Sequence, residues 1–278
     1  MTTLPLAGVI GDPVGHSRSP RLFAHWFSAH HIQGYYVPLH IAPGNFGSCV
    51  RRLPQMGFRG VNVTLPHKEA ALILADDVTD RARRIGAANT LTFQPDGRLH
   101  ADNTDGAGFL ANLYQTCPRW SATDGPALVL GAGGAARAIV VALLDAGAGR
   151  ILIANRTVAR AELLAADLGP LVEAAALDEV SDRLGAFSCV VNTTSLGMAG
   201  QPPLALPLDG LDPAALVTDI VYTPLETPFL RAAAARGCRV VDGLGMLLHQ
   251  AVPGFERWFG QRPEVTPQLR TAVLGYGP

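Results

Sequence analysis

Short apolar runs alternate with amphipathic segments along the chain, and polar or glycine-rich residues follow most of these runs. Runs of strand length occupy residues 6–10, 35–39, 60–64, 99–102, 128–130, 151–154, 189–192, 216–222 and 239–242. Patterns of helical period occupy residues 20–30, 45–56, 70–75, 107–115, 138–146 and 243–259. Alternating strands and helices are typical of an α/β fold with a mostly parallel sheet, whose ligands gather beyond the carboxyl ends of the strands.

The strand-to-helix junction at residues 127–137 has the spacing of a dinucleotide-binding loop. Apolar residues lead into glycines at 131 and 133 and a small residue at 136, which gives the pattern G-x-G-x-x-A. The first glycine permits a sharp turn, and the second lets backbone N–H groups approach a pyrophosphate at the helix N-terminus. The helix stops at Gly147, and the run at 151–154 completes a βαβ unit. We expect the pyrophosphate to contact Gly131, Ala132, Gly133, Gly134 and Ala135.

The residues after the second strand of this unit indicate which cofactor the loop binds. NAD enzymes usually carry an acidic residue here for the ribose 2′-hydroxyl. This chain instead has Asn155, Arg156 and Thr157, with Arg160 one turn further on. A guanidinium makes charge-assisted bonds of roughly 1.5–3 kcal/mol each, and a 2′-phosphate is the group that it would meet. We therefore expect NADP, with the alternative that both arginines are solvated surface residues.

A hydroxyl-rich loop follows the first strand. Ser17 and Ser19 precede Pro20, and the Ser-Pro pair predicts a helix with Ser19 as its N-cap and Pro20 as its first residue. The free N–H groups of that helix would point back at the loop, where the two serines could hold an anionic ligand. The alternative is that the serines only cap and turn the chain.

Two further polar clusters follow predicted strands. Lys68 lies just past a buried strand and opens a helix, where the macrodipole disfavours a cation by a few tenths of a kcal/mol or more. One explanation for a lysine at this position is a functional role, and the other is that it is an ordinary surface residue. Thr79 predicts an N-cap for a short helix. The strand at 99–102 returns from a hairpin turn at 94–97 and ends at the polar residues 103–105, directly before a helix.

Composition restricts the class of protein. The 278 residues suffice for two domains, and a hydrophobic content of 48% allows a large core. A net charge of -1 and a charged fraction of 16% leave no basic stripe for nucleic acid. Because no segment resembles a signal peptide or a membrane span, we expect a cytoplasmic protein without nucleic-acid or membrane partners. Scattered cysteines argue against a metal site or a disulfide framework and favour burial as small apolar residues: Cys49, Cys117, Cys189 and Cys238.

The motifs together resemble those of the shikimate dehydrogenases, the NADP-dependent reductases of 3-dehydroshikimate. The likeness covers nearly the whole chain, and so many short motifs in one order are far more specific than any one of them. The matching segments are 16–20 (HSRSP), 62–68 (NVTLPHK), 85–90 (IGAANT), 103–105 (NTD), 131–136 (GAGGAA), 155–157 (NRT), 192–198 (NTTSLGM), 219–222 (DIVY) and 243–247 (GLGML), with Gln250.

The resemblance implies both a fold and a reaction. It implies an α/β fold in which an N-terminal, mostly parallel α/β substrate domain and a Rossmann dinucleotide-binding domain have a cleft between them. We expect residues 1–105 and 243–278 to form the substrate-binding and catalytic domain, and residues 106–242 to form the NADP-binding domain. The implied reaction is the reversible, NADPH-dependent reduction of 3-dehydroshikimate to shikimate, in chorismate and aromatic amino acid biosynthesis.

The resemblance also implies roles for individual residues. Lys68 matches the family's catalytic acid/base, and Asp105 matches its hydrogen-bonding partner at the reacting oxygen. Ser17 and Ser19 match the site of the substrate carboxylate. The other implied substrate contacts are Thr64, Asn89, Asp105, Tyr222 and Gln250. Positions implied near the nicotinamide end of the cofactor are Asp80, Ile220 and Gly243. Uncharged hydroxyls and amides suit a small polyhydroxylated acid better than a phosphorylated sugar, which calls for more arginine or lysine.

The chain departs from the family pattern at three positions. Phe23 and Ala24 stand where the family usually has His-Asn, and Ala101 stands where glycine is common. None of these changes touches a proposed chemical group, although each could alter packing near the cleft. The related alternatives are a quinate/shikimate or aminoshikimate dehydrogenase, and the alternative from another class is a non-catalytic NADP-binding regulatory protein. We expect a monomer or a homodimer.

Overall fold

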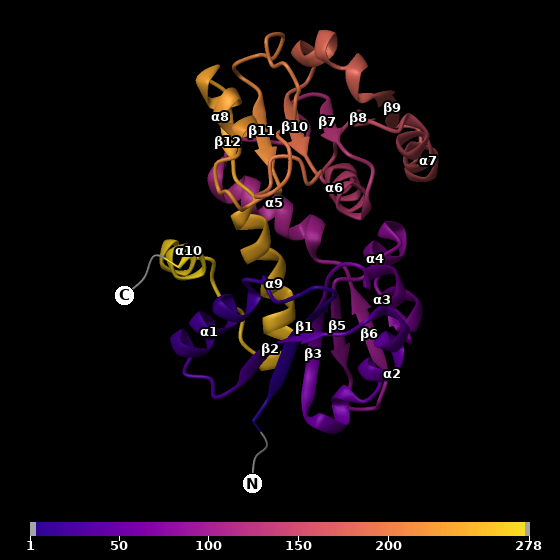
Figure 1. The fold of residues 1–278 in the computed structure, drawn as a ribbon, viewed down its shortest axis with the longest axis vertical. Helices are drawn as coiled ribbons and strands as arrows, with labels where there is room; N and C mark the ends of the chain where they lie inside the picture. Colours follow the sequence, from indigo (N-terminus) through magenta and orange to yellow (C-terminus); the bar gives the residue numbers. More distant parts are fainter. Residues whose placement is uncertain (1–3, 276–278) are drawn as a thin grey trace. The chain divides into compact units, whose positions relative to one another are not determined.

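The computed structural model describes residues 4–275, and the chain divides into two compact units. Unit 1 comprises residues 1–108 and 247–278, and unit 2 comprises residues 109–246 (Figure 1). The domains expected from the sequence, 1–105 with 243–278 and 106–242, stay a prediction at their boundaries. Residues 1–3 and 276–278 of the first expected domain lie outside the described residues. The cleft expected between the domains also stays a prediction.

Unit 1 is built on a mixed six-stranded sheet with the strand order β2-β1-β3-β5-β6-β4. β1 pairs in parallel with β2 and β3, whereas β5 runs antiparallel to both β3 and β6. The predicted hairpin at residues 94–97 joins β5 to β6 and inserts this antiparallel pair. The strands are β1 (Leu6–Gly11), β2 (Tyr35–His40), β3 (Phe58–Val63), β4 (Asp77–Val78), β5 (Thr90–Phe93) and β6 (Leu99–Asp102).

Helices cover both faces of this sheet. On one face, Phe46 and Val50 belong to the same apolar cluster as Val61. On the other face, the ring of Phe23 stacks on that of Tyr36, with 3.7 Å between centroids. Phe23 is one of the departures from the family pattern, and it lies inside an aromatic cluster between α1 and α9. The helices of the unit are α1 (Ser19–Ala29), α2 (Phe46–Val50), α3 (Lys68–Leu74), α4 (Asp80–Ile85) and α10 (Pro267–Leu274), with the start of α5 (Asp105–Thr116) and most of α9 (Leu244–Phe259).

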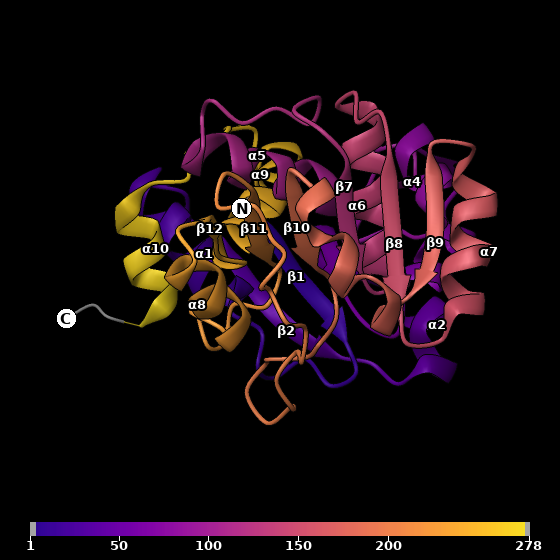
Figure 2. The same cartoon turned by 90° about the horizontal axis from the view of Figure 1, so that it is seen from above.

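Unit 2 is a doubly wound, fully parallel sheet with the strand order β12-β11-β10-β7-β8-β9. Figure 2 shows its strands β7, β8 and β9 side by side. Alternate residues of β7 face opposite clusters, because Val129 packs with α6 and α7 whereas Leu128 packs with α8. The elements are β7 (Ala127–Leu130), α6 (Gly134–Asp145), β8 (Ile151–Asn155), α7 (Val158–Leu168), β9 (Val172–Ala176), β10 (Cys189–Asn192), β11 (Leu216–Asp219), α8 (Pro228–Ala235) and β12 (Arg239–Val241). This architecture is the predicted Rossmann arrangement.

Two predicted elements are wrong in their extent. The helix expected over 45–56 is broken into α2 and two 3-10 turns, Pro43–Asn45 and Leu53–Met56. Pro54 has no N–H to donate to the carbonyl of Val50, so the α-helical hydrogen bonding stops before it and a 3-10 turn follows. The strand expected over 216–222 ends at Asp219, because the amide of Val221 donates to Oδ1 of Asp219, at 2.9 Å, rather than to a neighbouring strand.

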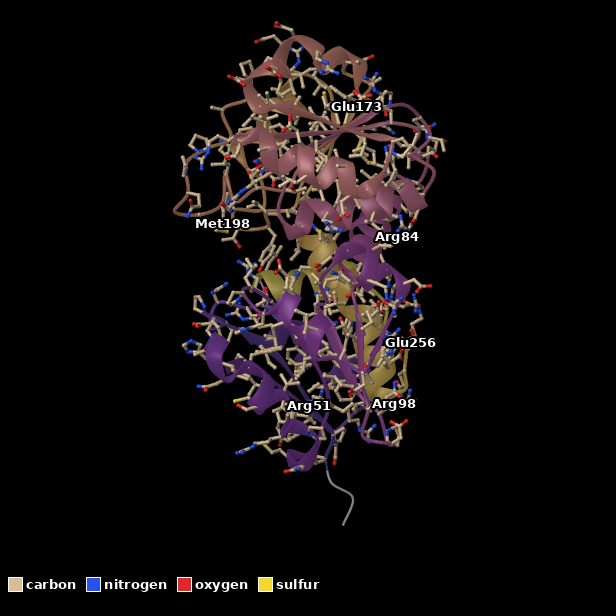
Figure 3. All side chains as sticks on the ribbon, turned by 90° about the vertical axis from the view of Figure 1, so that its right-hand side faces the viewer. Arg51, Arg84, Arg98, Glu173, Met198 and Glu256 are labelled. Carbon is tan, nitrogen blue, oxygen red and sulfur yellow. The ribbon has the colours of Figure 1, made fainter. Side chains whose placement is uncertain are left out.

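Charged side chains lie mostly at the outside of each unit. Arg51, Arg98 and Glu173 are among the charged residues labelled in Figure 3, and each belongs to an exposed ion pair. Such solvated pairs contribute little to stability. No helix among residues 4–275 is long and apolar enough to cross a membrane.

The four cysteines are free thiols. The expected burial holds for Cys189 and Cys238, whereas Cys49 and Cys117 are only half-buried. Burial raises the pKa of the Cys189 thiol to about 12, which keeps it protonated.

Candidate active site

Lys68 is held by the residues around its backbone. It is the first residue of α3, and the preceding residue, His67, is buried with its ring stacked on that of Phe46 at 4.7 Å between centroids. Nε2 of His67 lies 2.7 Å from the carbonyl oxygen of Ile41. The carbonyl of Lys68 accepts a hydrogen bond of 2.8 Å from the amide of Ala88. The start of the lysine side chain is therefore fixed, which supports a defined position for its ammonium.

The ammonium of Lys68 meets the carboxylate of Asp105. Nζ lies 2.6 Å from Oδ2, and the two side chains are 25% and 11% exposed. Asp105 is the first residue of α5, where the helix dipole favours a negative charge. Its amide donates to Oδ1 of Asn103 at 3.1 Å. The structure thus brings together the two residues that the resemblance names as acid/base and partner.

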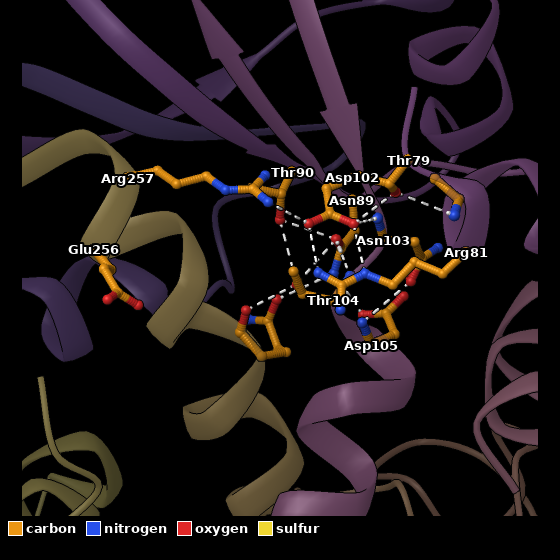
Figure 4. Close-up of polar contacts among 12 residues, drawn as sticks. Thr79, Arg81, Asn89, Thr90, Asp102, Asn103, Thr104, Asp105, Glu256 and Arg257 are labelled. Atoms are coloured by element: carbon orange, nitrogen blue, oxygen red, sulfur yellow. Dashed lines mark hydrogen bonds and ion pairs between the residues drawn. The ribbon is translucent and has the colours of Figure 1, made fainter. Parts of the chain in front are cut away.

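Asn89 joins this pair to Gln250. Its Nδ2 donates to Oδ1 of Asp105 at 2.8 Å and to Oε1 of Gln250 at 3.2 Å. Its Oδ1 accepts hydrogen bonds from the amide of Thr104 and from the hydroxyl of Thr90, both at 2.9 Å (Figure 4). Because both ends of the amide are bonded, Asn89 has one defined orientation. Four predicted site residues, Lys68, Asn89, Asp105 and Gln250, therefore belong to one hydrogen-bonded group.

The serine loop differs from its prediction in one detail. Ser19 is the first helical residue, so the prediction that it is the N-cap is wrong; the N-cap is Arg18, which makes no side-chain cap hydrogen bond. Oγ of Ser17 accepts the amide of Ser19 at 3.3 Å, a bond that does not use the hydroxyl proton of Ser17. That proton is available to an anionic ligand.

Ser19 connects to the sheet through Tyr36. Burial raises the pKa of Tyr36, so its phenol stays protonated, and its hydroxyl donates to Oδ1 of Asn62 at 2.8 Å. The hydrogen bond between Ser19 and Tyr36 is then donated by Ser19. Nδ2 of Asn62 donates to the carbonyl of Asn89 and to the hydroxyl of Thr90, both at 3.2 Å. Ser19 and the hydrogen-bonded group around Lys68 are thus parts of one buried network.

Sequence reasoning did not single out Tyr36 and Asn62 as members of the site. The available signal was Asn62, a polar residue in the middle of the apolar strand β3. Thr64, the predicted contact, lies one residue past that strand, is half-buried, and donates its amide to the carbonyl of Ile10 at 2.8 Å. Its position at the carboxyl end of β3 agrees with the expected place of ligands at this sheet.

The glycine loop of unit 2 has the geometry of a phosphate cradle. Gly131 has φ +109°, and a Cβ there would lie 2.7 Å from Oγ1 of Thr193, so only glycine fits. α6 begins at Gly134, and its N-cap, Gly133, has no side chain to bond the free amides. A Cβ at either Gly133 or Gly134 would meet nothing within 4 Å. The open, uncapped N-terminus of α6 fits a pyrophosphate.

The residues after β8 fit an additional phosphate. Asn155 ends the strand, and its Nδ2 donates to the carbonyl of Thr157 at 2.9 Å, which shapes the turn into α7. Arg156 and Arg160 are exposed. Within residues 4–275 neither guanidinium is paired with a carboxylate, so both are available to an added anion. The residues present therefore fit the 2′-phosphate of NADP.

A buried carboxylate organises the segment that carries Ile220 and Tyr222. Asp219 accepts hydrogen bonds from Asn192 at 3.0 Å, from the amide of Val221 at 2.9 Å and from Thr227 at 2.8 Å. Burial raises the pKa of Asp219, and these three donors act in the opposite direction. The carboxylate thereby holds the turn that leads from β11 into Tyr222.

Gly243 lies directly against this segment. A Cβ at Gly243 would be 2.4 Å from the carbonyl carbon and oxygen of Ile220, so the two predicted nicotinamide-end positions approach closely within unit 2. Asp80, the third such position, begins α4 in unit 1. Its carboxylate is 96% exposed and pairs with Arg83 at 2.7 Å, and its role toward the cofactor stays a prediction.

Three stretches of the chain match known protein families. Residues 9–91 match the shikimate dehydrogenase substrate binding domain, residues 117–198 match shikimate / quinate 5-dehydrogenase, and residues 243–273 match the shikimate 5′-dehydrogenase C-terminal domain. The curated shikimate dehydrogenase (NADP(+)) of Paracoccus denitrificans is 60% identical over 270 residues, which are 97% of this chain and 96% of that protein.

Solved structures resemble the chain over the same length. Shikimate 5-dehydrogenase from Thermus thermophilus, in complex with NADP(H) and shikimate, has a TM-score of 0.87 at 37% identity and covers 98% of this chain and 99% of its own. Quinate dehydrogenase from Corynebacterium glutamicum, in complex with NAD, has a TM-score of 0.91 at 30% identity over the same shares. The matched families, the near full-length identity and the shared fold agree, and the chain belongs to the shikimate dehydrogenase family.

Proposed function

We propose that this protein is an NADP-dependent shikimate dehydrogenase that reversibly reduces 3-dehydroshikimate to shikimate, with Lys68 as acid/base and Asp105 as its partner. The observation that carries the proposal is the 2.6 Å contact between Nζ of Lys68 and Oδ2 of Asp105, within the network that contains Asn89 and Gln250. The name of the relative from Paracoccus denitrificans, shikimate dehydrogenase (NADP(+)), supports the substrate and the cofactor.

The chemistry needs one proton at the reacting oxygen. When bound, NADPH supplies a hydride to the substrate carbon, and NADP⁺ accepts one in the reverse direction. In reduction, the ammonium of Lys68 donates a proton to the oxygen as the carbonyl becomes a hydroxyl, and the lysine is left as a neutral amine. In oxidation, the neutral amine of Lys68 takes the hydroxyl proton. Asp105 holds the ammonium in place, and the positive charge of Lys68 favours negative charge developing on the oxygen.

The substrate contacts that we propose are polar and uncharged apart from this pair. Ser17 donates its free proton to the substrate carboxylate, and Ser19 lines the same end of the site. The ring hydroxyls meet Thr64, Asn89, Gln250 and Tyr222. This donor set suits a polyhydroxylated acid, because a phosphate would call for arginine or lysine.

The cofactor contacts that we propose follow the two halves of NADP. The pyrophosphate lies on the N-terminus of α6, against residues 131–135. The 2′-phosphate pairs with Arg156 and Arg160, beside Asn155 and Thr157. The nicotinamide end lies near Asp80, Ile220 and Gly243. We further propose that the protein acts in the cytoplasm as a monomer or homodimer and takes no nucleic acid.

The test is a spectrophotometric assay of NADPH or NADH formation with purified protein. Shikimate and quinate are compared, each with NADP⁺ and with NAD⁺. We expect the highest kcat/KM for shikimate with NADP⁺. A preference for quinate would instead make the protein a quinate/shikimate dehydrogenase, and binding of NADP⁺ without turnover of either acid would make it a non-catalytic binding protein.

A further inference from the structure

Asp102 has a buried carboxylate that residues of two helices, α4 and α9, contact. It ends β6, and its side chain is 0% exposed. Nε and Nη2 of Arg81 donate to its two oxygens at 2.7 and 2.6 Å, and the hydroxyl of Thr79 donates to Oδ1 at 2.8 Å. Nη2 of Arg257 lies 3.0 Å from Oδ2. Figure 4 shows the two guanidinium groups reaching Asp102 from different sides, one from α4 and one from α9.

One set of contacts leads from Asp102 to Asp105. Oδ1 of Asp102 also accepts the amide of Asn103 at 2.8 Å. Nδ2 of Asn103 donates to the carbonyl of Ala87 at 2.9 Å, and Oδ1 of Asn103 accepts the amide of Asp105 at 3.1 Å. The buried carboxylate therefore fixes the start of the turn from which Asp105 projects toward Lys68.

A second set of contacts leads from Asp102 to Gln250. Arg257 and Gln250 are seven residues apart on α9, so their side chains lie on the same face of the helix, two turns apart. Oε1 of Gln250 accepts from Asn89, and the carbonyl of Gln250 accepts from the hydroxyl of Thr104 at 2.8 Å. The Asp102–Arg257 contact thus joins the end of β6 to the face of α9 that carries Gln250.

Because Asp102 is buried, its carboxylate depends on its partners for stability. A carboxylate away from water is stable only when it is paired and hydrogen-bonded, and loss of one partner leaves the other groups uncompensated. The exposed ion pairs of unit 1, such as Arg262 with Glu256 on α9, have no such requirement because water solvates them. A change at Asp102 is therefore transmitted to its neighbours, whereas a change at Arg262 is not.

We propose that Asp102 is a positioning residue for the reaction, with Arg257 as its link to α9. Asp102 sets the turn that presents Asp105 to Lys68, and through Arg257 it sets Gln250. This proposal rests on the proposed function, because Asp105 and Gln250 are the groups that it positions.

The experiment measures kcat and KM for shikimate and NADP⁺ in the full-length protein and four variants. For Asp102→Asn we expect kcat to fall by about 10- to 100-fold, the cost of a misplaced catalytic group. For Arg257→Leu we expect KM for shikimate to rise roughly tenfold, as for one lost hydrogen bond, with KM for NADP⁺ unchanged. Arg257→Lys retains a cation for Asp102 and should recover most of that KM. Arg262→Leu is the matched control and should behave as wild type.

Two outcomes overturn the proposal. Asp102→Asn and Arg257→Leu could lower thermal stability while leaving kcat and KM per folded molecule at the wild-type values. Alternatively, crystal structures of wild type and Asp102→Asn could show the same 2.6 Å distance between Lys68 Nζ and Asp105 Oδ2, whereas we expect that distance to lengthen. A wild-type protein without turnover of shikimate refutes the proposed function instead, and the crystallographic distance still decides the positioning.

Discussion

The ionisation of Asp102 should make the stability of unit 1 depend on pH in a specific window. Burial opposes its charge and raises the pKa, but the hydrogen bonds and charge of Arg81, with Thr79 and Arg257, outweigh that effect. The pKa consequently falls from the ordinary value of 3.8 to about 2. A carboxyl group whose pKa is lower in the folded state stabilises the fold above its unfolded pKa, and this contribution is lost as pH falls through the folded pKa.

The size of the effect follows from the shift. At about 1.36 kcal/mol per pKa unit, a drop from 3.8 to about 2 corresponds to about 2 kcal/mol in the free energy of unfolding. Solvent around the guanidinium groups of Arg81 and Arg257, which are 39% and 35% exposed, screens part of this interaction, so about 2 kcal/mol is an upper value. We expect the full contribution above about pH 5, roughly half of it at pH 3, and almost none below pH 2.

The assay compares urea unfolding of two proteins between pH 7 and pH 3. One is wild type at position 102 and the other carries Asp102→Asn. Both carry Trp120→Phe, so that fluorescence from Trp26 and Trp258, the other two tryptophans of the chain, reports unit 1. The difference in unfolding free energy should be about 2 kcal/mol at pH 7 and should narrow by up to about 1 kcal/mol at pH 3.

A second comparison, of wild type with Asp96→Asn, tests whether the pH dependence of the unfolding free energy comes from the buried carboxylate. Asp96→Asn removes an exposed carboxylate that pairs with Arg98 at 2.7 Å, and its pH dependence should be much weaker. A difference between wild type and Asp102→Asn that stays constant from pH 7 to pH 3 would show that the reasoning about Asp102 is wrong.

Three further predictions concern other parts of the chain. Gly60→Ala would place a Cβ 1.9 Å from Nε1 of Trp258, so we expect a loss of about 1–3 kcal/mol or more in urea unfolding, whereas Gly44→Ala, with open space around its Cβ, should be nearly neutral. Burial lowers the pKa of His249 to about 4, so wild type should lose stability as pH falls from about 6.5 to about 4, and His249→Gln should remove that slope. Arg156→Gln should raise KM for NADP⁺ by about tenfold or more and leave KM for NAD⁺ unchanged, and equal effects on both cofactors would remove Arg156 from the 2′-phosphate site.

Local signals in the sequence predicted local structure well. Thr79 caps α4 as expected, because its hydroxyl accepts the amide of Ala82 within one turn. Gly131 takes the positive φ that its place after β7 required, and Gly147 takes the same kind of conformation after α6. Each of these features depends on neighbours a few residues away, so residue type and spacing are enough to predict it.

Two local predictions were wrong where a nearby side chain accepted a backbone hydrogen bond. Ser19 looked like an N-cap, but Ser17 supplies the side-chain oxygen and the helix begins one residue earlier than expected. Asp219 withdraws the amide of Val221 from the sheet, which ends β11 before the apolar run ends. Hydrophobic pattern alone does not record such competition for backbone hydrogen bonds.

The site itself depended on contacts that spacing does not reveal. Lys68 and Asp105 are 37 residues apart, and their pairing was expected from the family resemblance rather than from periodicity. Asp102 and Arg257 are 155 residues apart, and neither position carries a local signal for a partner. Long-range polar pairs form where the fold places them, so the contact between Asp102 and Arg257 was found only in the structure.

The most direct measurement of the central claim is turnover by Lys68→Ala with shikimate and NADP⁺, alongside the dissociation constant for NADP⁺. If Lys68 moves the proton at the reacting oxygen, kcat should fall by about 10²- to 10⁴-fold while the affinity for NADP⁺ stays within about twofold of wild type. A kcat near the wild-type value would contradict the account, because the 2.6 Å contact with Asp105 would then be a structural ion pair only.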